Sequence, residues 1–300
     1  YIGSSLATFL LSKNYNVTVI DTLKYSKISL SHLLINKNFK FVYGDVRNKN
    51  LLKKLINENQ IIIPLAALVG APLCEKNKKL AKEINLKNIE FIVKNLSKKH
   101  QILYPTTNSG YGIGLKNKFC DENSPLNPIS LYGRTKVDAE KIVHKFDNSI
   151  CFRLATVFGV SYRMRSDLLV NNFVYRAIKF KKLDLFEPNF RRNFIHIHDV
   201  VRAFYFAIKN FKRLRGNIYN LGLSNANLSK LMLAKIIKKE IKNLKITLVK
   251  NRKDPDKRDY YVSNRKIEKK GFKPIVNLSD GVKELNQYFT YNKSEIKNNY

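Results

Sequence analysis

A chain of 300 residues is long enough for one large α/β domain, or for a main domain with a smaller second one, and its hydrophobic content of 44% supports a full core. The formal net charge of +33 favours anionic ligands, and by itself it suggests nucleic acid or an acidic membrane surface. The lysines, however, are spread along the whole chain and form no block or stripe. We therefore predict no nucleic-acid partner and no membrane partner, and the longest apolar run, 61–74, is too short to span a bilayer.

The start of the chain and its cysteines point to the cellular compartment. The sequence begins Tyr1-Ile2-Gly3 rather than with methionine, so we expect it to be truncated at its N-terminus, and no signal peptide is visible. Cys74, Cys120 and Cys151 have no metal-ligand spacing, and a sparse, odd set of cysteines fits a reducing environment. We predict a cytoplasmic protein.

Strands and helices alternate over the first half of the chain, which indicates a parallel, doubly wound sheet. The predicted strands are 17–20, 39–43, 61–65, 101–104 and 150–154, and the predicted helices are 4–13, 48–57, 77–98 and one beginning near Tyr132. From about Ser161 the strands become shorter, at 194–197 and 218–221, and Asn227 or Ser229 could cap a helix that runs to about Lys239. We predict a first domain over 1–160, a smaller C-terminal α/β domain over 161–291 from which about 192–210 returns to the first domain, and a frayed tail over 292–300.

The N-terminal segment carries two features of a dinucleotide site. Gly3 falls where the third glycine of a G-x-x-G-x-x-G turn would lie, and that glycine permits close helix–strand packing beside a pyrophosphate. Asp21 ends the next apolar strand, where a carboxylate can bind the ribose hydroxyls and would repel a 2′-phosphate. Gly3 and Asp21 together favour NAD over NADP as the cofactor. Two alternative interpretations remain open: that Gly3 belongs to an ordinary turn, and that Asp21 only ends a strand. We expect a Rossmann-like domain whose first strand is missing from this fragment, with Asp45 and Val46 at the adenine edge.

Tyr132 and Lys136 are four residues apart, so on a helix they lie on one face. A cation beside a phenol favours the phenolate and lowers the pKa of the tyrosine, and a phenolate can act as a base toward an alcohol. Thr107, upstream, could hydrogen-bond the same substrate oxygen. Most Tyr-x-x-x-Lys pairs are only a surface lysine beside a partly buried tyrosine, so the neighbouring motifs decide the interpretation.

Together these motifs make the chain resemble the extended short-chain dehydrogenase/reductases (SDRs), the nucleotide-sugar epimerase/dehydratase family. The residues that carry the resemblance are Tyr1-Ile2-Gly3, Asp21, Gly44-Asp45-Val46, Leu65-Ala66-Ala67, Thr106 to Gly112, Tyr132, Lys136, Arg153 and Arg192 to Asp199. They follow the family's order over nearly the whole chain. The resemblance implies that Tyr132 is the catalytic base, that Lys136 holds the nicotinamide ribose, and that Thr107 bonds the reacting sugar oxygen. It also implies a homodimer through the Tyr132 helix.

The resemblance further implies the two sets of binding residues. The cofactor set is Ile2, Gly3, Asp21, Asp45, Val46, Leu65, Ala66, Ala67, Tyr132 and Lys136, and the substrate set is Thr107, Asn108, Ser109, Asn171, Arg192 and Arg258. Arg192 would meet the pyrophosphate of a nucleotide sugar, because a guanidinium fork suits two phosphate oxygens. For five residues a place in the sugar and guanine pocket and a solvated surface role are both open: Asn171, Asn172, Arg163, Arg165 and Arg258.

Four longer strings, 61–74, 104–114, 153–171 and 254–260, are similar to the GDP-heptose 4-dehydrogenases of bacterial capsule synthesis. This similarity implies NAD-dependent oxidation of a C4 hydroxyl. Tyr162 departs from the proline usual in that subgroup, whereas Pro64 is shared with it.

The two positions after Thr107 indicate the type of reaction. Dehydratases of the family carry Asp-Glu at these positions and decarboxylases keep a Glu there. Asn108 and Ser109 cannot transfer protons as a carboxylate would, so we predict neither reaction. A 4-epimerase, a catalytically silent SDR-like binding protein and, from the charge alone, a nucleic-acid binder are the alternatives.

His196 and His198 alternate on a predicted strand and so would face one side. No third ligand is evident, and we predict no metal site. Asp199 is expected to cap the helix that follows.

Overall fold

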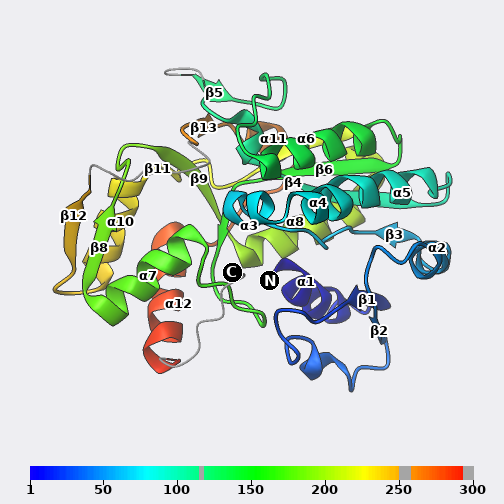
Figure 1. The fold of residues 1–300 in the computed structure, drawn as a ribbon, viewed down its shortest axis with the longest axis horizontal. Helices are drawn as coiled ribbons and strands as arrows, with labels where there is room; N and C mark the ends of the chain where they lie inside the picture. The colour runs from blue at the N-terminus through cyan, green and yellow to red at the C-terminus, as the bar shows by residue number, and fades with distance from the viewer. Residues whose placement is uncertain (115–117, 250–257, 293–300) are drawn as a thin grey trace.

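The computed structural model describes residues 1–114, 118–249 and 258–292, and its centre is a parallel sheet (Figure 1). Strands β3 (Ile61–Ile62), β4 (Gln101–Thr107), β6 (Ser149–Leu154) and β10 (Asn217–Leu221) pair in the order β10-β6-β4-β3. A second parallel pair joins β1 (Val17–Asp21) to β2 (Phe39–Tyr43). Within the described residues no pairing connects β1 to β3. The predicted parallel, Rossmann-like fold is confirmed, whereas the missing first strand stays a prediction.

Helices cover both faces of the four-stranded sheet. Strand β6 is buried along its whole length, and its successive side chains enter two different apolar clusters. Phe152 packs with α1 (Ile2–Leu11) and α8 (Ile197–Lys209), whereas Cys151 packs with α2 (Lys49–Glu58), α5 (Asn88–Lys94) and α6 (Leu131–His144). The sheet is therefore doubly wound, with α1 and α8 on one face and α6 on the other.

The helix predicted over 77–98 is present from Lys78 to Lys94 and ends four residues early. It consists of α4 (Lys78–Lys82), a π-helical turn η2 (Glu83–Lys87) that was not predicted, and α5. A short helix α3 (Ala71–Lys76) precedes it, and Asn77 between the two leaves helical geometry, with φ −129° and ψ 58°. The strand predicted over 61–65 pairs only at Ile61 and Ile62, which is consistent with Pro64, because proline has no N–H to donate to a ladder.

The C-terminal region has its own sheets and core, on the left in Figure 1. Strands β7 (Thr156–Phe158), β9 (Arg191–His196) and β11 (Asn227–Ser229) form one sheet, and β8 (Lys182–Leu185) pairs with β12 (Lys245–Leu248). Helices α7 (Leu169–Phe180), α10 (Lys230–Glu240) and α12 (Leu278–Tyr291) share one apolar cluster. Ser229 caps α10 by accepting from Met232 N, as predicted.

The chain returns to the large sheet at β10, which lies beyond the predicted range 192–210, while α8 within that range packs beside α1. The domain boundary at residue 160 stays a prediction. Residues 254–257 of one family string and residues 293–300 of the predicted tail lie outside the described residues. The remaining short elements are η1 (Ser31–Leu33), η3 (Asn108–Tyr111), β5 (Phe119–Cys120), α9 (Phe211–Leu214), β13 (Tyr261–Val262) and α11 (Arg265–Lys269).

The predictions for His196, His198 and Asp199 need correction. Strand β9 ends at His196, whose Nδ1 caps α8 by accepting from His198 N, so the two histidines do not share one strand face. Asp199 is not the cap, because His196 already occupies that position. The Asp199 carboxylate instead accepts the backbone N–H groups of Ile275 and Val276 and pairs with Arg202 at 2.7 Å.

The described part of the chain holds no group of three or more His, Cys, Asp or Glu side chains placed to ligate a metal. None of its helices combines the length and the apolar character that a bilayer crossing requires.

Candidate active site

The site begins with helix α6, which carries Tyr132 and Lys136. Ser130 caps this helix, because its Oγ accepts a hydrogen bond from Gly133 N at 3.1 Å. Two glycines let α6 approach the turn after β4 closely. A Cβ at Gly110 would lie 2.9 Å from Val137 of α6, and one at Gly133 would lie 3.4 Å from the carbonyl oxygen of Ser109. The first turn of α6 therefore lies against the Thr107–Ser109 segment.

Lys136 is a buried lysine with its ammonium over an aromatic ring. Its side chain is 5% exposed, and Nζ lies 4.1 Å from the ring centroid of Tyr104. Burial lowers the pKa of Lys136 to about 7, although Cys151 and Glu140 raise it in part. Within the described residues Nζ donates no hydrogen bond, yet an ammonium has three donors and buried donors normally find acceptors. A ribose diol would supply such acceptors, so this position fits the predicted contact with the nicotinamide ribose.

Tyr132 lies one helical turn before Lys136 and is half-buried. Its phenol is close enough to Tyr104 to act on it electrostatically, because the pKa of Tyr104 is raised first by burial and then by Tyr132. The Tyr104 hydroxyl has no hydrogen-bond partner among the described residues. Tyr104 of β4 thus lies beneath the Lys136 ammonium and within electrostatic reach of the Tyr132 phenol.

Three of the predicted substrate residues are joined by hydrogen bonds. Thr107 Oγ1 accepts from Ser109 N at 3.1 Å and donates to Ser109 Oγ at 3.2 Å. Arg258, from a distant part of the sequence, donates from Nη1 to the same Ser109 Oγ at 3.1 Å. Asn108 is 1% exposed, and neither atom of its amide has a partner among the described residues. No carboxylate stands at positions 108 and 109, so these positions lack the acid and base that water elimination needs.

Asn171 and Arg192 are both buried. The Asn171 amide accepts from Gly159 N at 3.0 Å and donates to Arg165 O at 2.8 Å, so it holds the loop before α7 in place. The predicted substrate contact of Asn171 would have to share these bonds. Arg192 is 1% exposed on β9, and its Nη1 donates to Arg191 O at 3.3 Å.

The two other arginines weighed for the sugar pocket have partners inside the protein. Arg165 pairs with Asp167, and the guanidinium of Arg163 lies 5.0 Å from the ring centroid of Tyr25. Burial lowers the pKa of Arg163, and the neighbouring Arg165 lowers it further.

The predicted cofactor residues lie at the carboxyl ends of β1, β2 and β3 and at the start of α1. Ile2 and Gly3 open α1, Asp21 ends β1, and the segment 65–67 follows β3. Gly3 faces that segment, since a Cβ there would lie 3.5 Å from Leu65 Cδ1. Asp21 is exposed, and its Oδ1 accepts from Leu23 N at 2.7 Å. The carboxyl ends of these parallel strands thus present a carboxylate and an apolar loop beside a helix start, which suits an NAD molecule lying across them.

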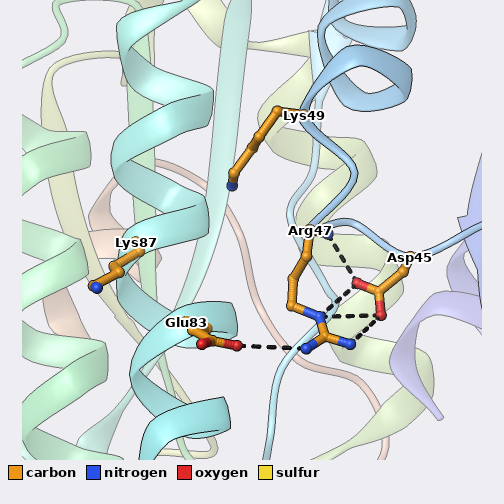
Figure 2. Close-up of a pocket in the computed structure, with 5 residues that line it drawn as sticks. All are labelled: Asp45, Arg47, Lys49, Glu83 and Lys87. Carbon is orange, nitrogen blue, oxygen red and sulfur yellow. Dashed lines mark hydrogen bonds and ion pairs between the residues drawn. The ribbon is translucent and has the colours of Figure 1, made fainter.

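Asp45 lies on this edge but is held by Arg47, as Figure 2 shows. Its Oδ1 accepts from the Arg47 backbone N at 2.8 Å, and its Oδ2 pairs with Nη2 at 2.7 Å. The hydrogen bond from Arg47 lowers the pKa of Asp45. The same guanidinium reaches Glu83 of η2 at 3.4 Å across a cavity of about 440 Å³ that Lys49 and Lys87 also line. An adenine edge at Asp45 would therefore share its carboxylate with Arg47.

Sequence analysis did not find Asn85, which the structure places beside the site. Asn85 is 1% exposed within η2, and its amide bonds the backbone N and O of Leu68, each at 2.9 Å. It also donates to Thr135 Oγ1 of α6 at 3.4 Å. Asn85 therefore ties the loop after β3 to the helix that carries Tyr132. The prediction of one helix over 77–98 gave no sign of the π-helical turn in which Asn85 lies.

The comparisons with known proteins agree with this geometry. Residues 1–222 match the model of the NAD dependent epimerase/dehydratase family, so the chain belongs to that family. It is 27% identical to CDP-paratose 2-epimerase of Salmonella typhi over 95% of both chains. It is also 27% identical to dTDP-D-glucose 4,6-dehydratase of Homo sapiens, over 95% of this chain and 85% of that one. The structure of UDP-glucuronic acid 4-epimerase from Bacillus cereus, solved with UDP-glucuronic acid and NAD, superposes with a TM-score of 0.83 at 25% identity and covers 97% of this chain and 96% of that one.

The protein is thus an NAD-dependent nucleotide-sugar epimerase/dehydratase of the extended SDR family, which confirms the predicted enzyme class and the predicted cofactor. GDP-heptose as substrate and C4 oxidation as the net reaction stay predictions.

The lowered pKa of the buried Lys136 predicts how the free energy of unfolding depends on pH. The pKa of Lys136 is about 7 in the folded protein and near 10.5 in the unfolded chain, so between these values the unfolded state binds a proton that the folded state lacks. The free energy of unfolding should therefore rise with pH from 7 to 9 relative to Lys136→Met, by up to about 1.4 kcal/mol per pH unit. Urea denaturation of both proteins without NAD at pH 6 to 9 measures this difference. A difference that does not change with pH would contradict the lowered pKa.

Proposed function

We propose that the enzyme oxidises the C4 hydroxyl of a nucleotide sugar, with a GDP-heptose as substrate, for the synthesis of a bacterial capsule or other surface polysaccharide. The observation that carries the proposal is the packing of the Tyr132 turn of α6 against the Thr107–Ser109 turn, with Lys136 buried one turn behind. The support for GDP-heptose is the similarity of the four sequence strings alone.

In the proposed reaction Tyr132 removes the proton from the sugar hydroxyl while Thr107 hydrogen-bonds the same oxygen. NAD, when bound, supplies the acceptor for the C4 hydride. Lys136 as a nearby cation stabilises the phenolate, and an anionic phenolate in turn favours the charged form of Lys136. Arg192 and Arg258 supply positive charge for a diphosphate, and Asn108 has an amide with spare donors and acceptors for sugar hydroxyls.

The second candidate is a 4-epimerase, in which the ketone turns in the site and takes the hydride back. The similarity to the UDP-glucuronic acid 4-epimerase of Bacillus cereus favours it. A 4,6-dehydratase is disfavoured although relatives carry that name, because Asn108 and Ser109 replace the carboxylates. A silent binding protein is disfavoured because Thr107, Tyr132 and Lys136 are all present and placed together.

The other parts of the proposal concern organisation. Residues 161–291 would form the substrate-binding region, and two chains would pair through α6 in the cytoplasm. Size-exclusion chromatography with light scattering would test the dimer directly.

The product distinguishes the candidates. With GDP-heptose and NAD we expect a 4-keto GDP-sugar that retains its 6-hydroxyl, together with the accumulation of NADH at 340 nm. The reason is that the site holds a base for oxidation but no carboxylate pair for elimination. NMR of the product in deuterated water reads the outcome. A C4-inverted sugar with no net NADH would favour the epimerase, and a 6-deoxy product would refute the argument from Asn108 and Ser109.

A further inference from the structure

A second pocket lies on the face of the sheet opposite α6. It is a cavity of about 450 Å³ between the C-terminal end of α1, the second half of α8 and the turn that follows α11. Helices α1 and α8 pack on one face of the sheet and α6 on the other, so the sheet separates this pocket from Tyr132 and Lys136. The volume falls within the range of about 300 to 1,000 Å³ that is usual for small-molecule sites.

Four aromatic rings form the walls of this pocket: Phe9, Tyr205, Phe206 and Phe272. Phe9 meets Tyr205 edge-on with 5.7 Å between centroids, and Phe206 meets Phe272 at 5.6 Å. Phe272 is 3% exposed and belongs to the apolar core, so its ring is fixed in place. The walls therefore offer two aromatic pairs, one of which includes the buried Phe272, and such pairs favour a flat ring as the ligand.

Four cations surround these rings: Lys13, Arg202, Lys209 and Lys273. Lys13 Nζ lies 5.5 Å from the Phe9 centroid, and the Arg202 guanidinium lies 5.7 Å from that of Phe272. Within the described residues Lys209 and Lys273 have no hydrogen bond or ion pair from their side chains, and both are exposed.

The pocket has no carboxylate in its lining. The nearest one described above, Asp199, is fully buried and already accepts from Arg202 and from two backbone N–H groups. Arg202 is thus paired with a carboxylate, whereas Lys13, Lys209 and Lys273 line the same cavity and have no carboxylate partner among the described residues. An anion bound there would relieve their mutual repulsion.

We propose that this pocket is a second ligand site, which binds a nucleoside monophosphate or a closely similar aromatic anion. The base would lie against the aromatic pairs, and the phosphate would pair with Lys13 and Lys209. Aromatic stacking and charge-assisted hydrogen bonds are the two interactions that such a ligand needs, and the pocket supplies both. The proposal is independent of which reaction the catalytic site performs.

The test is calorimetric titration of adenosine 5′-monophosphate into the whole protein at physiological ionic strength, with saturating NAD to occupy the cofactor site. The double variant Lys13→Gln with Lys209→Gln is expected to weaken binding by at least about tenfold, because two charged partners are lost. The matched control is Lys238→Gln with Lys239→Gln, which removes two exposed charges from α10 and should leave binding unchanged. Circular dichroism confirms that each variant is folded.

Two further titrations separate the parts of the proposal. Tyr205→Leu should weaken the monophosphate but not inorganic phosphate, because only the base contacts the ring. Absence of binding to the unaltered protein, binding that survives the Lys13 and Lys209 changes, or equal loss in the α10 control would overturn the site. Equal affinity for inorganic phosphate and the nucleotide would overturn the proposed contact between the base and the aromatic rings.

Discussion

Replacing Tyr132 by phenylalanine is expected to lower kcat by about 10²- to 10⁴-fold, the usual contribution of a general base, while NAD binding changes little. The substitution removes only the phenolic oxygen and leaves α6 and its contacts with the Thr107–Ser109 turn intact. The measurement is NADH formation with GDP-heptose, together with the affinity for NAD by calorimetry. Near-normal turnover in Tyr132→Phe would remove this residue from the role of base.

A matched control for this variant is Tyr43→Phe at the end of β2. Tyr43 is 74% exposed and lies outside the proposed proton path, so its loss of a hydroxyl should leave kcat unchanged. Equal losses in the two variants would mean that the effect is not specific to the phenol of Tyr132.

Replacing Arg153 by methionine is expected to destabilise the fold by about 3 to 5 kcal/mol, because it strands the Glu140 carboxylate in the interior. The two side chains are 4% and 2% exposed, and Nη2 lies 2.7 Å from Oε1. Arg153 also donates from Nη1 to the Tyr111 hydroxyl at 3.0 Å, so a second buried group loses a partner. Urea denaturation measures the free energy of unfolding, and a loss below about 1 kcal/mol would show that the pair does not hold α6 on β6.

Two variants sharpen this test. Asp138→Asn breaks an exposed pair with Lys141 on the same helix, with side chains 53% and 68% exposed, and should cost less than about 1 kcal/mol. Adding Glu140→Leu to Arg153→Met should recover part of the lost stability, because the unpaired buried charge is then gone. No recovery in the double variant would attribute the loss to packing rather than to charge.

The net reaction depends on a feature that side-chain identity does not report. A released ketone and a 4-epimer share the same first oxidation, with the same base, threonine and lysine. The two reactions differ in whether the keto-sugar can rotate within the site, so that its opposite face is reduced, before it leaves. The product analysis described above therefore decides between them, whereas the Tyr132→Phe variant tests the step that they have in common.

The sequence by itself determined the fold class, the family and the order of the site residues. Apolar strands that alternate with helices predict a buried parallel sheet, and local signals narrowed the cap of α10 to Asn227 or Ser229, of which Ser229 is the cap. The spacing of Tyr132 and Lys136 was sufficient to place both on one helical face, because that geometry is local.

Only the tertiary structure decided the features that depend on distant partners. The π-helical turn at 83–87 lies where the Asn85 amide hydrogen-bonds the backbone of Leu68. The Asp199 carboxylate accepts hydrogen bonds from the backbone of Ile275 and Val276 and does not cap its own helix. In the same way Arg153 finds Glu140, and the rings and cations of the second pocket come from three separate segments. Hydrophobic periodicity and propensity describe neighbours within a few residues, whereas a buried polar group takes the partner that folding brings to it, however far away that partner lies in the sequence.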